Sequence, residues 1–66
     1  MEWKSSKRKT PDFGVEIEIK YKHKIDGDTF TFTMSSRLER IVETIAGKDF
    51  WFNGNRCLQY FEWRKI

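Results

Sequence analysis

The stretch VEIEIKYKHKIDGDTFTFTM, residues 15–34, decides the fold because apolar and polar side chains alternate on both sides of a turn signal. Alternation with a period of two is typical of a β-strand with one buried face. Asp26-Gly27 is a dipeptide that favours the two-residue type I′ turn. The stretch therefore predicts a β-hairpin whose two strands are joined by these two residues.

The side chains also predict the register of this hairpin. A two-residue loop places Tyr21 opposite Phe32, and every apolar residue of the second strand then lies on the apolar face of the first. A three-residue loop would put Lys24 opposite Phe30 and mix the two faces. We therefore expect the register of the two-residue loop.

The polar face of the hairpin carries lysine and threonine close to the turn. In the expected register Lys20, Lys22 and Lys24 lie opposite Thr33, Thr31 and Thr29. Ammonium and hydroxyl groups in a row suit phosphate oxygens, and an ordinary solvated sheet face has the same composition. Glu16 and Glu18 carry the opposite charge further along this face. A phosphate contact would thus be confined to the half of the hairpin near the turn.

The segment after the hairpin predicts a helix over residues 36–46. Ser36-Arg37-Leu38-Glu39 matches a capping box, in which the first and last side chains satisfy free amides of the first helical turn. Apolar residues follow at helical spacing and form one stripe: Leu38, Ile41, Val42 and Ile45. Gly47 is the residue type expected just beyond the end of a helix.

The last segment predicts a second hairpin around Asn53-Gly54-Asn55 and leaves two registers open. With a two-residue loop, one face carries Phe50, Phe52, Cys57, Phe61 and Trp63, and the other carries Trp51, Leu58 and Tyr60. With a three-residue loop, Phe50, Phe52, Leu58 and Tyr60 share one face, and Trp51, Cys57, Phe61 and Trp63 share the other. Both registers leave large apolar side chains on a face that a single helix cannot cover.

The expected order of elements is β-β-α-β-β, an α+β fold of two layers with one helix packed on a four-stranded sheet. This order resembles the β-grasp of ubiquitin-like folds and immunoglobulin-binding bacterial domains, and the resemblance is in the order of elements only. A meander or a split-hairpin sheet is the alternative. We expect residues 14–66 to form this single domain and residues 1–13 to form a flexible basic arm.

The composition favours a small binding protein. The chain has 66 residues and a net charge of +3, with an isoelectric point near 9.2 and a mean hydropathy of −0.75. No apolar run approaches the ~20 residues of a membrane span, so we expect a cytoplasmic protein with no membrane partner. Residues 1–12 hold four basic and two acidic side chains, so most of the positive excess lies in the arm.

No catalytic or cofactor site is expected. The chain has one cysteine and one histidine, Cys57 and His23, too few for a conventional zinc site and not spaced as a catalytic pair. Asp26 and Asp28 belong to a hairpin turn rather than to an oxygen-ligand metal loop. We therefore expect neither an enzyme nor a bound metal.

Two classes of function remain. The first is a nucleic-acid-associated protein that contacts the phosphate backbone of DNA or RNA through Lys7, Arg8, Lys9, Lys20, Lys22, Lys24, Thr29 and Thr31. The alternative is a protein-interaction module or a small inhibitor of the kind that phages encode, which uses Trp51, Arg56, Tyr60 and Trp63 and includes self-association as a homodimer. A third arrangement has the arm covering these aromatic residues, with Trp3 folded over them.

Overall fold

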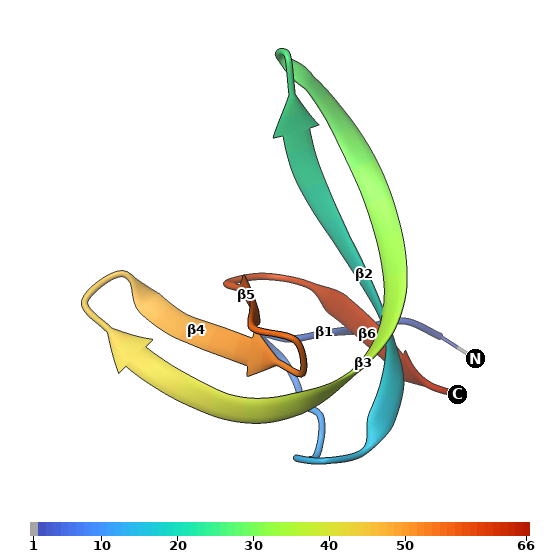
Figure 1. The fold of residues 1–66 in the computed structure, drawn as a ribbon, viewed down its shortest axis with the longest axis vertical. Coiled ribbons are helices and arrows are strands. Elements are labelled where there is room, and N and C mark those ends of the chain that lie inside the picture. The colour runs from blue at the N-terminus through green and yellow to red at the C-terminus, as the bar shows by residue number, and fades with distance from the viewer. Residues whose placement is uncertain (1) are drawn as a thin grey trace.

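The computed structural model describes residues 2–66 and consists of six antiparallel strands (Figure 1). The strands are β1 (Lys4–Ser5), β2 (Glu16–Ile25), β3 (Asp28–Thr44), β4 (Gly47–Phe52), β5 (Arg56–Leu58) and β6 (Glu62–Lys65). They form one sheet in the order β1-β6-β2-β3-β4-β5. Residues 2–66 form no helix, and so none that could cross a membrane. The predicted α+β fold is therefore wrong, because the described chain is all-β.

The first hairpin has the predicted turn and register. Tyr21 pairs with Phe32, and the lysines of β2 pair with the threonines of β3 as expected from a two-residue loop. Asp26 and Gly27 have φ angles of 53° and 84°. A type I′ turn requires positive φ at both of these positions, so the local sequence and the side-chain pattern specify the same turn.

The predicted helix over residues 36–46 is instead the second half of β3. The pairing of β3 with β4 shifts between Leu38 and Arg40, which is a β-bulge. The extra residue changes the alternation of side chains, so Leu38 and Ile41 lie opposite Phe52 and Phe50 on one face. Because of the bulge, two apolar residues three apart in the sequence share a face of this strand. The same spacing is typical of one face of a helix.

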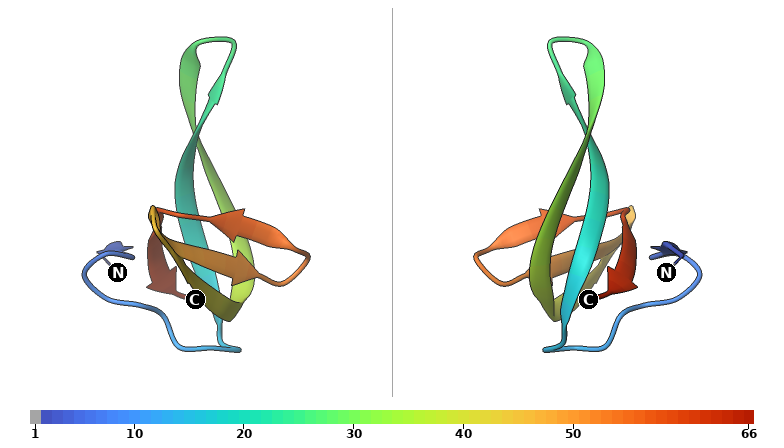
Figure 2. Two further views of the ribbon diagram at one scale, coloured as in Figure 1. Left: turned by 90° about the vertical axis from the view of Figure 1, so that its left-hand side faces the viewer. Right: turned by 90° about the vertical axis from the view of Figure 1, so that its right-hand side faces the viewer.

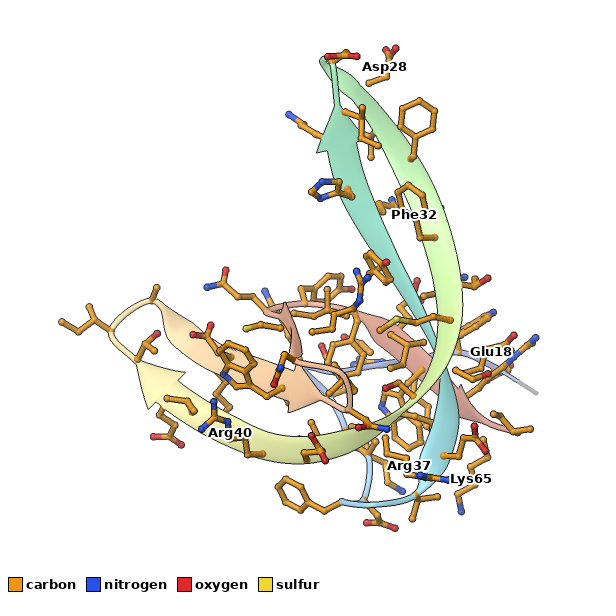
Figure 3. All side chains as sticks on the ribbon, in the orientation of Figure 1. Glu18, Asp28, Phe32, Arg37, Arg40 and Lys65 are labelled. Carbon is orange, nitrogen blue, oxygen red and sulfur yellow. The ribbon has the colours of Figure 1, made fainter. Side chains whose placement is uncertain are left out.

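The length of β3 lets the sheet fold over on itself. The strand pairs with β2 along its first part and with β4 beyond the bulge, and it bends sharply between the two parts (Figures 1 and 2). In Figure 3, Asp28 and Phe32 lie on the first part, whereas Arg40 lies beyond the bend. The core between the two parts consists of Ile17, Ile19, Leu38, Phe50, Phe52, Phe61 and Trp63. A bent sheet therefore encloses its own core without a helix.

The second hairpin adopts the register of the three-residue loop, with Phe50 opposite Leu58 and Phe52 opposite Arg56. The chain leaves this hairpin after Leu58, and β6 pairs with β2 and β1 instead. Trp63 is consequently only 3% exposed, and its expected place on an open aromatic face is wrong. The segment after the turn forms two separate strands, β5 and β6, and each can place its apolar side chains toward the core. The uncovered apolar face expected for a single hairpin therefore does not form.

The N-terminal segment lies against the sheet. Strand β1 pairs with β6, and the amide of the buried Ser6 donates a 3.0 Å hydrogen bond to the Phe61 carbonyl. The Phe61 amide donates in return to Ser6 Oγ at 3.2 Å. These contacts attach part of the expected arm to the core. Its flexibility in solution stays a prediction.

The outer part of the first hairpin, residues 21–32, is called the finger below; it contacts the core at its base through Tyr21 and projects away from the other strands toward its turn (Figures 1 and 2). Strand β6 pairs with β2 only as far as Lys20, so the finger is a ribbon of two strands. Its apolar side chains are open to solvent because no helix covers them. Ile25, Phe30 and Phe32 are 45%, 46% and 37% exposed.

Candidate functional site

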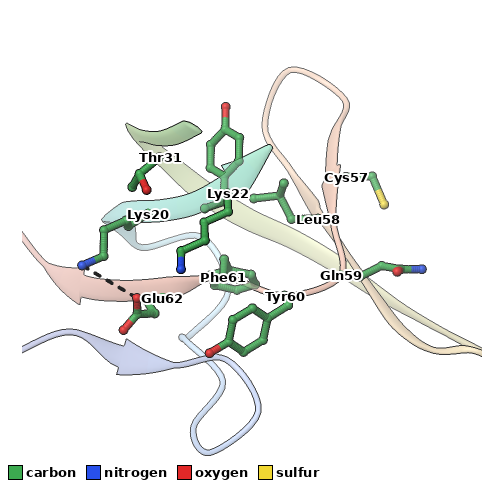
Figure 4. A pocket seen from close by; sticks show the side chains of 10 residues that line it. Lys20, Lys22, Thr31, Cys57, Leu58, Gln59, Tyr60, Phe61 and Glu62 are labelled. Carbon is green, nitrogen blue, oxygen red and sulfur yellow. Dashed lines mark ion pairs between the residues drawn. The ribbon is translucent and has the colours of Figure 1, made fainter. Parts of the chain in front are cut away.

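Two neighbouring hollows meet at Tyr60. The first, of about 600 Å³, is lined by side chains that include Lys20, Lys22, Thr31, Tyr60 and Glu62 (Figure 4). The second, of about 460 Å³, is lined by residues that include Ser6, Lys7, Arg8, Lys48 and Tyr60. We call the joint feature the basic groove, defined by the cations Lys7, Arg8, Lys20, Lys22 and Lys48 around Tyr60.

The end of the β2–β6 pairing opens the first hollow. The last pair is Lys20 opposite Glu62. Beyond it β2 is paired with β3 alone and has no neighbour on its other edge, and the Lys22 side chain lines the hollow from there (Figure 4). Side chains two apart on a strand share a face, and this places both lysines on one side of β2.

The short connection between β5 and β6 exposes the ring of Tyr60. The next residue, Phe61, is fully buried, and its ring meets those of Phe50 and Phe52 edge to face at centroid distances of 5.0 and 5.1 Å. Tyr60 itself is 53% exposed. The buried Phe61 thus directly follows the exposed Tyr60 in the chain, and its packing limits the movement of the Tyr60 backbone.

The N-terminal segment brings Lys7 onto the ring. The amides of Arg8 and Lys9 each donate a 3.0 Å hydrogen bond to the Ser5 carbonyl, which closes a turn. The Lys7 ammonium then lies 5.4 Å from the centroid of the Tyr60 ring. Contacts of this kind contribute about 0.5–1 kcal/mol at exposed sites, so the pair is available to a ligand rather than locked.

The groove is strongly positive. Five basic side chains and one acidic side chain, Glu62, line the two hollows. The Lys20 ammonium lies 3.7 Å from a Glu62 carboxylate oxygen, and both side chains are partly exposed. Among residues 2–66, Lys22 makes no ion pair. A concave surface with this excess attracts anions.

A second aromatic ring lies close to the groove. The ring of Trp3 has the Lys20 ammonium 4.5 Å and the Arg64 guanidinium 4.3 Å from its centroid. Arg64 also donates a 2.5 Å hydrogen bond to Glu18. Because Lys20 touches both the groove and this ring, Trp3 extends the surface of aromatic and basic groups toward β6. The N-terminal segment covers one aromatic residue of the predicted patch, Trp63, through Lys4 and Lys9.

The structure brings together some of the predicted phosphate-binding residues and separates others. Lys7, Arg8, Lys20, Lys22 and Thr31 all line the basic groove. Lys24 and Thr29 pair with each other near the tip of the finger, outside the groove. Lys9 is exposed, and its carbonyl accepts a hydrogen bond from the Trp63 indole.

The residues predicted to form a protein interface do not make one patch. Trp63 is buried, and Tyr60 belongs to the groove. Trp51 is half-buried, with the Arg40 guanidinium 4.9 Å from the centroid of its ring. Arg56 lies elsewhere and donates a 2.9 Å hydrogen bond to the Tyr21 hydroxyl.

Sequence reasoning missed Lys48 as a member of the groove. This lysine is the second residue of β4, and it reaches the groove only because β4 folds over toward the N-terminal segment. No local pattern signals that contact, since it depends on the bend in β3. Trp3 was only weakly indicated as part of this surface, by being a lone tryptophan in a basic polar segment.

The thiol of Cys57 lines the first hollow without being activated. Cys57 is exposed, but desolvation by its neighbours, and next the Asp49 carboxylate, raise the pKa of its thiol, whereas the Arg40 guanidinium acts in the opposite direction. A raised pKa lowers the fraction of the nucleophilic thiolate. Within residues 2–66, no three histidine, cysteine or acidic side chains cluster in a way that could hold a metal ion.

Comparisons of the chain with protein-family models, with curated proteins and with solved structures each find no match. The function therefore has to be inferred from the groove itself.

Proposed function

We propose that this protein binds single-stranded DNA or RNA in the basic groove. The observation that carries the proposal is an exposed aromatic ring, Tyr60, set among five cations with one acidic side chain. Proteins that bind single strands combine a positive groove along the backbone with aromatic rings on which bases stack. Both parts are present in the groove.

The residues divide into two roles. Lys7, Arg8, Lys22 and Lys48 contact phosphate oxygens, and the Thr31 hydroxyl adds a donor to them. Tyr60 offers its ring to one base. Every base has a π-face, so this contact discriminates little between sequences, and we expect low sequence specificity.

The affinity should fall steeply as salt is added. Each phosphate contact releases condensed counterions, and for single strands the slope of log K against log salt is roughly −0.7 per contact. Five contacts would give a slope of about −3.5, and four would give about −2.8. Lys20 already lies beside Glu62, so the lower figure is the better expectation.

Fluorescence anisotropy with labelled oligothymidine and oligouridine tests the proposal. Lys22→Glu should weaken binding roughly tenfold or more at low salt, because it removes a cation and adds repulsion at the centre of the groove. Lys65→Glu is the matched control, since it makes the same change in net charge opposite Ile17, outside the groove. Equal weakening by the two variants would show that only net charge matters and would contradict the groove.

The stacking role of Tyr60 has its own pair of variants. Tyr60→Ala should lower the affinity by about 5- to 150-fold, which corresponds to 1–3 kcal/mol for one stacked base. Tyr60→Phe keeps the ring and should bind nearly as well as the unchanged protein. A duplex of the same length should bind more weakly, since its bases are already stacked. Equal binding of duplex and single strand would argue against the stacking role.

A further inference from the structure

The two edges of the first hairpin differ in the backbone groups that they leave unpaired. The Arg37 carbonyl accepts a hydrogen bond from the Asn53 amide on the side of β3 that faces away from β2. Backbone groups alternate in direction along a strand. Every second residue before Arg37 on β3 therefore directs its N–H and C=O groups away from β2. These residues are Thr29, Thr31, Thr33 and Ser35.

The side chains make only one of these edges suitable for pairing. On the β2 edge, the residues with unpaired backbone groups are Lys22 and Lys24, and lysine on an edge strand discourages pairing with another chain. The β3 edge reads TFTFTMSS over residues 29–36, with no charged residue, proline or glycine. Long, exposed and uncharged edges of this kind are templates for another strand.

We propose that a second copy of this chain pairs with the outer edge of β3 in an antiparallel register centred on Phe32. Thr29 of one copy then lies opposite Ser35 of the other, and Thr31 lies opposite Thr33. All four outward-facing residues find partners. A register centred on Thr31 would place Ser35 opposite the turn, and one centred on Thr33 would place Thr29 opposite Arg37, whose carbonyl is already bonded.

The side chains also match in this register. On the apolar face, Phe32 meets Phe32 of the second copy and Phe30 meets the partly buried Met34, so the two exposed phenylalanines gain neighbours. On the opposite face, Thr31 and Thr33 form a cross-strand pair, which suits their hydroxyl and methyl groups. The self-complementary order of apolar and threonine residues favours a second copy as the occupant over an unrelated strand.

The pairing does not depend on the proposed nucleic-acid function. It would nevertheless place the β2 lysines of both copies on one face of a continuous sheet, because opposite residues of an antiparallel pair share a face. Lys20, Lys22 and Lys24 of one copy would then extend the basic surface of the other.

Sedimentation velocity over a range of protein concentrations tests the pairing. The unchanged protein should shift with concentration toward twice the 8.0 kDa of one chain. Thr33→Pro removes an amide that β2 does not use, so it should keep the protein monomeric. Lys24→Pro is the matched control on the other edge and should still dimerise. Thr33→Lys, which leaves the backbone intact, should also be monomeric.

Cysteine cross-linking tests the register in a Cys57→Ser background. Phe32 would face itself across a non-hydrogen-bonded pair, with Cα atoms about 4.5 Å apart, within the range of a disulfide. Phe32→Cys should therefore form a cross-linked dimer on oxidation. Phe30→Cys should not, since four residues, or roughly 13 Å, would separate the two copies of this position. A protein that stays monomeric at every concentration, dimerisation of Thr33→Pro or Thr33→Lys, or equal cross-linking at both positions would overturn the proposal.

Discussion

The indole Nε1 of Trp63 donates a 2.8 Å hydrogen bond to the carbonyl oxygen of Lys9, so a core residue of β6 is tied to the N-terminal segment. A second tie lies close by, where the buried Ser6 exchanges hydrogen bonds with the backbone of Phe61. The segment that also places Lys7 over Tyr60 is thereby fixed to the core. Stability and the shape of the basic groove should consequently respond together to changes in this segment.

Replacing Ser6 with alanine should lower the free energy of unfolding by about 1–3 kcal/mol, because the buried Phe61 amide would lose an acceptor that water cannot replace. Ser5→Ala is the control. The Ser5 hydroxyl accepts a bond from the exposed Lys7 amide, which water can satisfy, so we expect a change within about 0.5 kcal/mol. Urea unfolding followed by tryptophan fluorescence measures both. An equal loss of unfolding free energy in the two variants would contradict a stabilising role for the buried hydrogen bond between Ser6 and Phe61.

Leu38→Ala and Ile45→Ala distinguish the strand from the predicted helix. In a helix over residues 36–46 both side chains would lie on the buried stripe, and both changes would be costly. In the structure Leu38 is fully buried and Ile45 is fully exposed at the β3–β4 turn. We expect Leu38→Ala to cost about 2–5 kcal/mol and Ile45→Ala to be nearly neutral, as measured by chemical unfolding. A comparable loss in both variants would favour the helix.

Arg40→Ala should destabilise the protein modestly, by about 0.5–1 kcal/mol, through loss of the cation over the Trp51 ring. The Trp51 ring would also become more accessible to a fluorescence quencher such as acrylamide. Arg37→Ala removes the same charge from the other side of the bulge and should leave quenching unchanged. Similar quenching in the two variants would mean that Arg40 does not shield the ring.

Alkylation of Cys57 should report its raised pKa. Because desolvation and the Asp49 carboxylate disfavour the thiolate, iodoacetamide should react with this exposed thiol more slowly at pH 8 than with a free cysteine, and the rate should rise as the pH increases. Asp49→Asn removes one cause and lowers the pKa, so it should speed the reaction at pH 8. Asp28→Asn, at the finger turn, should have no effect. A rate independent of Asp49 would remove that carboxylate as a cause.

The first hairpin could be predicted from sequence because two independent constraints agree. Asp26-Gly27 specifies the turn, and only one register keeps Tyr21, Phe30 and Phe32 on the apolar face. Both constraints are local, so no knowledge of the rest of the chain is required. The exposure of Ile25, Phe30 and Phe32 on the finger was not predictable from the hairpin, since it depends on what the other elements cover.

The second half of β3 was mistaken for a helix because the bulge mimics helical spacing. With one extra residue between them, Leu38 and Ile41 fall on the same face of a strand although they are three apart. The β-branched residues Ile41, Val42 and Thr44 favour a strand and were the signal against the helix. The letters of the capping box have no capping role in a strand.

The groove was predictable only in part. The sequence predicts the lysines of β2 and of the N-terminal segment as phosphate contacts, which stays a prediction, and it predicts Tyr60 for a protein interface rather than for this groove. Its position depends on the chain leaving the second hairpin after Leu58 and returning to β2. This path of the chain depends on which apolar side chains pack together in the core, and no short stretch of sequence specifies that packing.

The pairing of β6 with β2 has a consequence for how the chain folds. The two hairpins are local and can form in about 1–10 μs, whereas Ile17 must find Lys65 from nearly the other end of the chain. Such distant contacts slow folding, because the loop must close before the contacts stabilise it. Until β6 docks, Phe61 and Trp63 are missing from the core and the edge of β2 is open. We therefore expect refolding to be limited by this late step and to lose yield to aggregation as the protein concentration rises.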